Sequence, residues 1–304
     1  MTPPTKKRPH PNTALADAHP VSHPAVPNAV LSESDCPSTD AERDRLADLP
    51  YRNRVGDLGW LSRCARPDLA YATGALARVS HNPGLAHWHA STHALRYLKG
   101  RPHDAITYRR TGKPLIVYVD SDYLPDYGTR FDNRRSTTGW VAFHAGAAVR
   151  WCSRRQSGVA NSTCEAEYYA AFDAACGVLQ MRALLADLGL PQQAATPLLE
   201  DNQACIKLGT NVFSNSRKSA HIDARYHRLR HEVVNKRTIR FVYCPTGDQA
   251  ADALTKPLPA PAVRRFQLAM SGSVPLPLPD LDGPPGRVGR SVEQPDEFPK
   301  LTSV

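Results

Sequence analysis

The sequence contains no apolar run that approaches the roughly 18 residues needed for a membrane-spanning helix. Its first residues, MTPPTKKRPHP, include no apolar segment of the kind that marks a secretory signal. The seven cysteines are odd in number and include no CxxC pair, so neither a zinc ribbon nor a disulfide framework is indicated. These absences argue against a membrane-spanning or secreted protein and predict an intracellular one with reduced thiols.

Acidic residues are the minority charge: 29 Asp and Glu stand against 38 Lys and Arg, for a formal net charge of +9. Such a balance favours a polyanionic partner where the basic residues cluster. They cluster in residues 217–240, RKSAHIDARYHRLRHEVVNKRTIR. The alternative is a solvated helix face, but the functional interpretation is contact with backbone phosphates. The residues predicted to make it are Arg217, Lys218, Arg225, Arg228 and Arg230.

Composition divides the chain into four segments. Residues 1–45 and 271–304 are rich in proline and poor in large apolar residues, which predicts irregular or disordered tails. Residues 46–104 show helical spacing of apolar side chains, with one helix opening at Pro67 and a second running from about Pro83 to Lys99. Residues 105–270 hold the remaining strand and helix patterns, and we expect them to form one domain.

That domain is predicted to be α/β, with a mixed sheet flanked by helices. Short β-branched and aromatic segments separated by Gly, Pro and Asn turns predict an antiparallel meander. These segments are AITYRR, LIVYVDSD, TTGWVAFHAG and AAVRWCSRRQ. A long helix follows, from Thr163 as its cap to about Leu188. After it, the sequence predicts strands at PLLEDN and TIRFVYCP. It predicts helices at NQACIKLG, residues 221–236 and DQAADALTK.

Acidic residues occur at four structural junctions of this pattern. Asp120 follows the apolar run LIVYV. A buried carboxylate at this position costs free energy unless a cation or a hydrogen-bond partner binds it. Glu167 lies in the long helix, Asp201 follows the strand PLLE, and Asp252 lies in DQAADALTK. An α/β scaffold gathers hard oxygen ligands for Mg²⁺ in this way, and metal-assisted cleavage of a phosphodiester is the chemistry they favour.

Successive blocks of the chain resemble the polyprotein of copia-type LTR retrotransposons, at the end of its reverse transcriptase and over its ribonuclease H domain. The match runs from about residue 30 to 266 in the right order and spacing. The blocks are RPDLAYATG, HWHASTHALRYLKG, VDSD, NRRSTTGWVAF, WCSRRQ, STCEAEYYAA, DNQACIKL, KSAHIDARYHRLR and PTGDQAADALTKPLP.

The resemblance implies a ribonuclease H-like fold, with residues 46–104 similar to a reverse transcriptase thumb and connection. It implies hydrolysis of the RNA strand of an RNA/DNA hybrid by two Mg²⁺ ions, with Mn²⁺ as the alternative ion, about 3.5–4 Å apart. Their implied ligands, which are also the catalytic residues, are Asp120, Glu167, Asp201 and Asp252. The other expected partners are the remaining polyprotein segments, without a membrane, in a cytoplasmic particle or the nucleus.

The second ligand could be either of two glutamates in this helix. Glu165 and Glu167 are about 200° apart around it, so only one can face the sheet. The family register favours Glu167, and Glu165 then serves as a charge at the positive end of the helix.

Departures from the family pattern leave a second function open. The segment SDYLPDYGTRFDNRRSTTG lacks the usual Trp-Ala-Gly and is about four residues longer, and the paired aspartates of the polymerase palm are absent. We therefore do not expect the chain alone to act as a polymerase. A nucleic-acid-binding remnant of a mobile element without catalytic activity is the alternative to an active ribonuclease.

Overall fold

The computed structural model describes residues 17–27, 31–123, 135–211, 223–279 and 281 of the chain. Five strands in these residues form one mixed sheet in the order β3-β2-β1-β4-β5. The first three strands pair antiparallel, β4 runs parallel to β1, and β5 runs parallel to β4. The strands are β1 (Ile116–Asp122), β2 (Thr137–His144), β3 (Ala147–Arg155), β4 (Thr196–Glu200) and β5 (Ile239–Tyr243).

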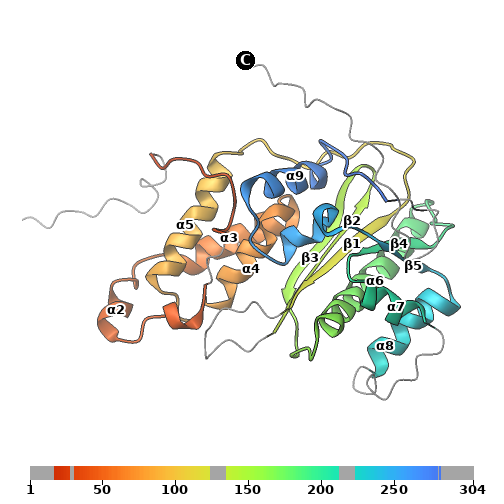
Figure 1. Cartoon of the computed structure of the whole chain (residues 1–304). Helices are drawn as coiled ribbons and strands as arrows, with labels where there is room; N and C mark the ends of the chain where they lie inside the picture. Colours follow the sequence, from red (N-terminus) through yellow and green to blue (C-terminus); the bar gives the residue numbers. More distant parts are fainter. Residues whose placement is uncertain (1–16, 28–30, 124–134, 212–222, 280, 282–304) are drawn as a thin grey trace, which may run out of the picture.

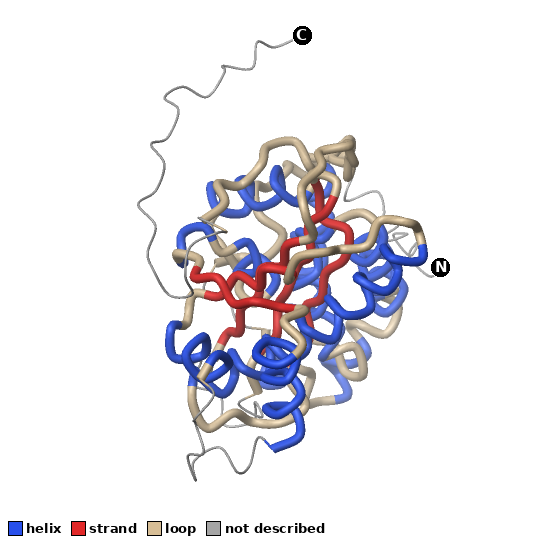
Figure 2. The backbone as a smooth tube through the Cα atoms, turned by 90° about the vertical axis from the view of Figure 1, so that its right-hand side faces the viewer, coloured by secondary structure: helices blue, strands red, loops and turns tan. Residues whose placement is uncertain are grey.

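Helices lie on both sides of this sheet, which runs through the middle of the molecule (Figure 2). The predicted α/β class, a mixed sheet flanked by helices, is confirmed. The longer helices are α3 (Tyr51–Cys64), α4 (Ala70–Arg78), α5 (Leu85–Lys99), α6 (Thr163–Asp187), α7 (Gln203–Thr210), α8 (Asp223–Arg230) and α9 (Ala260–Met270). Shorter pieces are η1 (Glu33–Asp35), α2 (Asp40–Asp44), η2 (Pro67–Leu69), the π-helix η4 (His231–Asn235), η5 (Thr246–Asp248) and η6 (Ala250–Leu254). Within the part of the chain described, no helix combines the length and apolar character needed to cross a bilayer.

Alternation along β1 separates two hydrophobic cores. Val117 and Val119 face α6 and its neighbours, whereas Ile116 and Tyr118 face the side of η6 and α9. Both faces of β1 are therefore buried, which explains the nearly continuous apolar run that precedes Asp120. Alternation also decides the face on which each residue at the end of this strand lies.

A third core joins α3, α4 and α5, which lie beside the β3 edge of the sheet in Figure 1. Apolar residues at helical spacing build this core, with Leu58, Leu76 and Tyr97 almost fully buried. Trp151 of β3 donates from Nε1 to the carbonyl of Ser62 at 2.7 Å and so connects the helices to the sheet. The helical segment thus packs directly against the strands.

Three expectations about local structure were wrong. Residues 105–110 form no strand, although backbone bonds from Thr107 to Ser271 and from Arg109 to Ala145 hold them in place. DQAADALTK begins at the last residue of η5 and forms the 3₁₀ turn η6, and the last helix is instead α9, which begins at the prolines of PLPAP. The cap of α6 is Ser162, whose hydroxyl accepts from the amide of Glu165.

Candidate metal centre

Two aspartates meet at one edge of the sheet because β1 and β4 are parallel neighbours. Tyr118 pairs with Leu199 in the parallel register, and continuing that register by two residues brings Asp120 level with Asp201. Both aspartates then lie on the face shared by Tyr118 and Leu199. Asp120 is 3% exposed, whereas Asp201, just past the end of β4, is half-buried.

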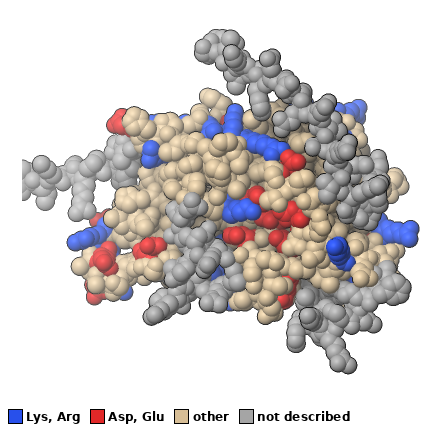
Figure 3. Space-filling model, viewed as in Figure 1, with Lys and Arg blue, Asp and Glu red and all other residues tan. Residues whose placement is uncertain are grey.

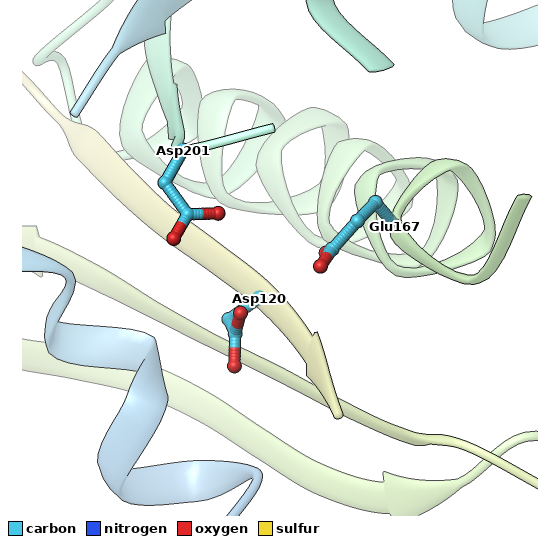
Figure 4. Close-up of side chains that lie close together, drawn as sticks. All are labelled: Asp120, Glu167 and Asp201. Carbon is cyan, nitrogen blue, oxygen red and sulfur yellow. The ribbon is translucent and has the colours of Figure 1, made fainter. Parts of the chain in front are cut away.

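Helix α6 supplies the third carboxylate, and its cap decides which glutamate faces the sheet. Glu165 is turned back toward its own helix, where Oε2 accepts from the amide of Asn161 at 2.7 Å and Oε1 accepts from the Tyr169 hydroxyl at 2.7 Å. Glu167 is 6% exposed, and its Oε2 has no hydrogen-bond partner among the described residues. The structure therefore turns Glu167 toward the aspartates, as Figure 4 shows.

One carboxylate oxygen from each of Asp120, Glu167 and Asp201 lies within 4.8 Å of the others. The three side chains converge from a central strand, a helix and the end of a second strand (Figure 4). Hydroxyl groups hold two of them: Thr246 Oγ1 donates to Asp201 Oδ2 at 2.7 Å, and Thr255 Oγ1 donates to Asp120 Oδ2. Both bonds use Oδ2, so among the described residues the Oδ1 atom of each aspartate remains available to a cation.

Asp252, the fourth predicted ligand, lies on η6 and is 6% exposed. It belongs to no group of three close ligands in the described structure, and its carboxylate pairs with Lys256. Lys256 Nζ lies 3.0 Å from Asp252 Oδ1 and 3.8 Å from Asp120 Oδ2. An ammonium group thus bridges the fourth acid and the first.

Burial of these acids disfavours their charged forms. Burial raises the pKa of Glu167 well above its usual range, and the negative charges of Glu200 and Asp120 raise it further. Burial followed by the charge of Asp120 raises the pKa of Asp252 to about 7, although Lys256 opposes the rise. Burial also raises the pKa of Asp201, despite its hydrogen bond from Thr246. Crowded carboxylates of this kind are stabilised in their ionised form by a bound cation.

Two further residues at this edge were not recognised from the sequence. Glu200 is fully buried on the α6 side; its Oε1 accepts from the amide of Asn202 at 3.0 Å, and burial raises its pKa well above the usual range. Lys256 lies one turn after Asp252, in the block DALTK. The alternation of PLLED indicates that Glu200 points inward. Lys256 could not be recognised in this way, because its two acidic partners, Asp252 and Asp120, are far apart from each other in the sequence.

The basic stretch predicted to contact phosphate is only partly described. Arg217 and Lys218 lie outside the described residues, as does the side chain of Arg225. Arg228 is exposed and lies near Cys176, where its charge opposes the rise in pKa that burial gives the thiol. Cys176 is about 13 Å along α6 from Glu167 at about 1.5 Å per residue. Arg228 and the half-buried Arg230 therefore belong to the α8 side of the molecule, and phosphate contact there stays a prediction.

The residues at the sheet edge suit a divalent cation with a preference for oxygen ligands. All three converging donors are carboxylates, without a cysteine or histidine among them, and this set favours Mg²⁺ or Mn²⁺ over zinc. The buried, unpartnered Oε2 of Glu167 is an acceptor that a cation would satisfy. The donor set therefore fits the expected metal.

Sequence comparisons place the chain among proteins of mobile elements. No protein-family model matches it. It is 37% identical over 245 residues to the retrovirus-related Pol polyprotein from transposon TNT 1-94 of Nicotiana tabacum, a match that covers 81% of this chain and 18% of that protein. It is 34% identical over 216 residues to the Pol polyprotein from transposon RE2 of Arabidopsis thaliana, covering 71% of this chain and 14% of the relative. Among solved structures, LC11-RNase H1, isolated from compost by a metagenomic approach, aligns with 50% of this chain and 96% of its own, with a TM-score of 0.35 and 18% identity.

The homologues of this chain are copia-type retrovirus-related Pol polyproteins of transposons, which match most of its length. It spans less than a fifth of the length of these relatives. The resemblance noted in its sequence blocks is thereby confirmed.

Proposed function

We propose that this chain is the ribonuclease H of a copia-type element, which hydrolyses the RNA strand of an RNA/DNA hybrid. One observation carries the proposal: carboxylate oxygens of Asp120, Glu167 and Asp201 converge within 4.8 Å at one sheet edge. Its oxygen-only donors suit Mg²⁺, and similarity to the Pol polyproteins supplies the substrate class.

In this account each side chain has a separate task. Asp120, Glu167 and Asp201 would hold a divalent ion, and Asp252, which pairs with Lys256, is the carboxylate that would be available for a second. Divalent ions bound there would activate the attacking water and stabilise the leaving oxygen of the phosphodiester. Thr246 and Thr255 orient two of the aspartates, and the Glu200 carboxylate fixes the turn after β4 through the Asn202 amide.

The family also indicates the setting of this activity. Because the relatives are much longer than this chain, we propose that further polyprotein segments are its partners. A cytoplasmic particle or the nucleus is the setting we propose for its reaction.

Two glutamates on the same helix provide the sharpest test. Glu167→Gln should reduce hybrid cleavage by at least about two orders of magnitude, the usual effect of losing a group that stabilises charge in the transition state. Glu165→Gln should keep most of the activity and lose about 1 kcal/mol of stability, because only its local hydrogen bonds weaken. The measurement is cleavage of a labelled RNA strand in a hybrid with Mg²⁺ or Mn²⁺.

The outcome also addresses the alternative of a remnant without catalytic activity. A parent protein that binds the hybrid but leaves it uncut under both ions would support that alternative. Equal activity in the two glutamine variants would refute the proposed ligand set.

A further inference from the structure

One basic side chain of the helical segment, residues 46–104, lies at the sheet edge that carries the carboxylates. Arg78 is the last residue of α4, and its Nη2 donates to Thr137 Oγ1 at 3.1 Å. Thr137 opens β2 and pairs with Asp122, two residues beyond Asp120 on β1. At about 3.4 Å per residue, Thr137 is about 7 Å along the strand from Asp120. The guanidinium group therefore lies at the end of the sheet where the metal ligands converge.

Packing of α4 against β3 fixes this position. A Cβ on Gly74 would lie 3.9 Å from the Ser153 carbonyl oxygen. Ser153 pairs with Gly139, which in turn pairs with Asp120. The middle of α4 is thus level with Asp120, and its last turn carries Arg78 onward to the strand end. The position of Arg78 is therefore set by the backbone of a packed helix, and not only by the length of its side chain.

Within the described residues, Arg78 contacts a hydroxyl group rather than a carboxylate. Several arginines are paired with an acid within 4.0 Å, as Arg66 is with Asp68 at 2.8 Å and Arg264 with Asp104 at 3.4 Å. Arg78 is exposed by surface area and has no acid within 4.0 Å among the described residues. Burial of its guanidinium group nevertheless lowers the pKa of Arg78, and the charges of Tyr71 and Asp122 oppose that decrease. A guanidinium group has five N–H donors, and one bond to a hydroxyl uses a single donor. The remaining donors suit an anionic ligand that comes from outside the protein.

We propose that Arg78 binds a backbone phosphate next to the linkage that lies over the carboxylates, so that the helical segment is part of the nucleic-acid interface. Arginine binds phosphate oxygens in a bidentate manner. Phosphates of one strand follow every roughly 3.4 Å along a duplex axis, so a phosphate one to three nucleotides away comes within reach. Acidic side chains gather near the centre of the face in Figure 3, with a basic side chain beside them. The inference rests on the proposed function, because that function places a phosphodiester over the acids.

The experiment measures hybrid binding against salt concentration, in an Asp120→Asn background so that the substrate stays intact. Arg78→Gln should weaken binding and reduce the log–log salt slope by about 0.7–0.9, the value for one lost phosphate contact. Arg78→Lys should keep the slope, since the charge remains, but lose some affinity. The matched control is Arg63→Gln, which removes the same charge from an exposed position on α3. Its neighbour Ser62 accepts a hydrogen bond from Trp151. Trp151 pairs with Val141, which pairs with Tyr118, so Arg63 is expected to lie farther from the end of β1 that carries Asp120 and Asp122.

Each result decides the matter. If Arg78→Gln and Arg63→Gln leave the same slope as the parent, Arg78 only ties α4 to β2 and the inference fails. If Arg78→Gln does not fold, the Arg78→Lys variant decides, because a loss of slope despite the retained charge would contradict phosphate contact. If hybrid binding depends on Arg78 but the parent protein does not cleave the hybrid, this inference is supported and the proposed function is refuted. Absence of hybrid binding would remove both.

Discussion

Lys256 forms an ion pair with Asp252 one helical turn away, with Nζ 3.0 Å from Oδ1. Burial alone would lower the pKa of Lys256, but the charges of Asp120 and Asp252 raise it to about 12. The ammonium group therefore stays positive and neutralises part of the carboxylate cluster. In this position it competes with a cation for Asp252.

Removing this charge should make the protein more dependent on metal. Lys256→Met leaves the carboxylates without a positive neighbour, so in EDTA at pH 8 we expect a loss of about 1 kcal/mol, limited because the side chain is 34% exposed. Excess Mg²⁺ should then stabilise the variant more than the parent, because a cation that binds only the folded state stabilises it. Thermal unfolding with EDTA and with Mg²⁺ measures both effects. Lys207→Met on the exposed face of α7 is the control, and an equal response to Mg²⁺ in the two variants would contradict the account.

Stability without metal should fall as the pH rises toward neutrality. The folded protein keeps a proton on Asp252 up to a pKa of about 7, whereas the unfolded chain loses it near the ordinary aspartate pKa of 3.8. The folded state therefore binds more protons in this window, and the free energy of unfolding decreases with pH by up to about 1.4 kcal/mol per unit. Asp252→Asn removes this contribution. Urea unfolding in EDTA from pH 4.5 to 7.5 should show a smaller decline for the variant than for the parent, and parallel curves would refute the assignment.

Gly139 should be intolerant of a side chain because η6 packs directly on it. A Cβ there would lie 2.5 Å from Thr255 Cγ2 and 2.9 Å from Leu254 Cβ. Gly139→Ala must push η6 outward, which we expect to cost about 1–3 kcal/mol and to reduce cleavage by moving Asp252 and Thr255. Gly158→Ala is the matched control, since nothing lies within 4 Å of its Cβ position. Equal melting temperatures and equal cleavage for the two variants would show that η6 does not depend on this contact.

Local patterns predicted most of the sheet and the convergence at its edge. The apolar run before Asp120 indicates a strand buried on both faces, and the acids at strand ends indicate a shared site. The parallel pairing of β1 with β4, which brings Asp120 level with Asp201, was seen only in the structure. The orientation of Glu167 followed from the family register, and the structure gives the physical reason: Glu165 is held by Asn161 and Tyr169.

Features that depend on distant partners could not be predicted in this way. AITYRR has the composition of a strand, but a strand requires a neighbour to pair with, and residues 105–110 make only isolated bonds. No helix was predicted after DALTK, where three prolines follow closely, yet Pro259 caps α9 and Pro261 lies in its first turn, where proline is compatible with a helix. Arg78 and Lys256 resembled ordinary surface charges, because Thr137 beside Arg78 and Asp120 beside Lys256 come from other segments of the chain.

The most direct test of the central claim is cleavage by the Asp120→Asn variant. Asparagine keeps the shape of the side chain and removes the charge that a divalent ion requires. Asp187→Asn, at the exposed end of α6, removes an equal charge far from the cluster and serves as the control. With Mg²⁺ and a labelled RNA/DNA hybrid, we predict that the parent and Asp187→Asn cleave the RNA strand, whereas Asp120→Asn binds the hybrid and leaves it intact. Cleavage by Asp120→Asn at the rate of the parent would contradict the account.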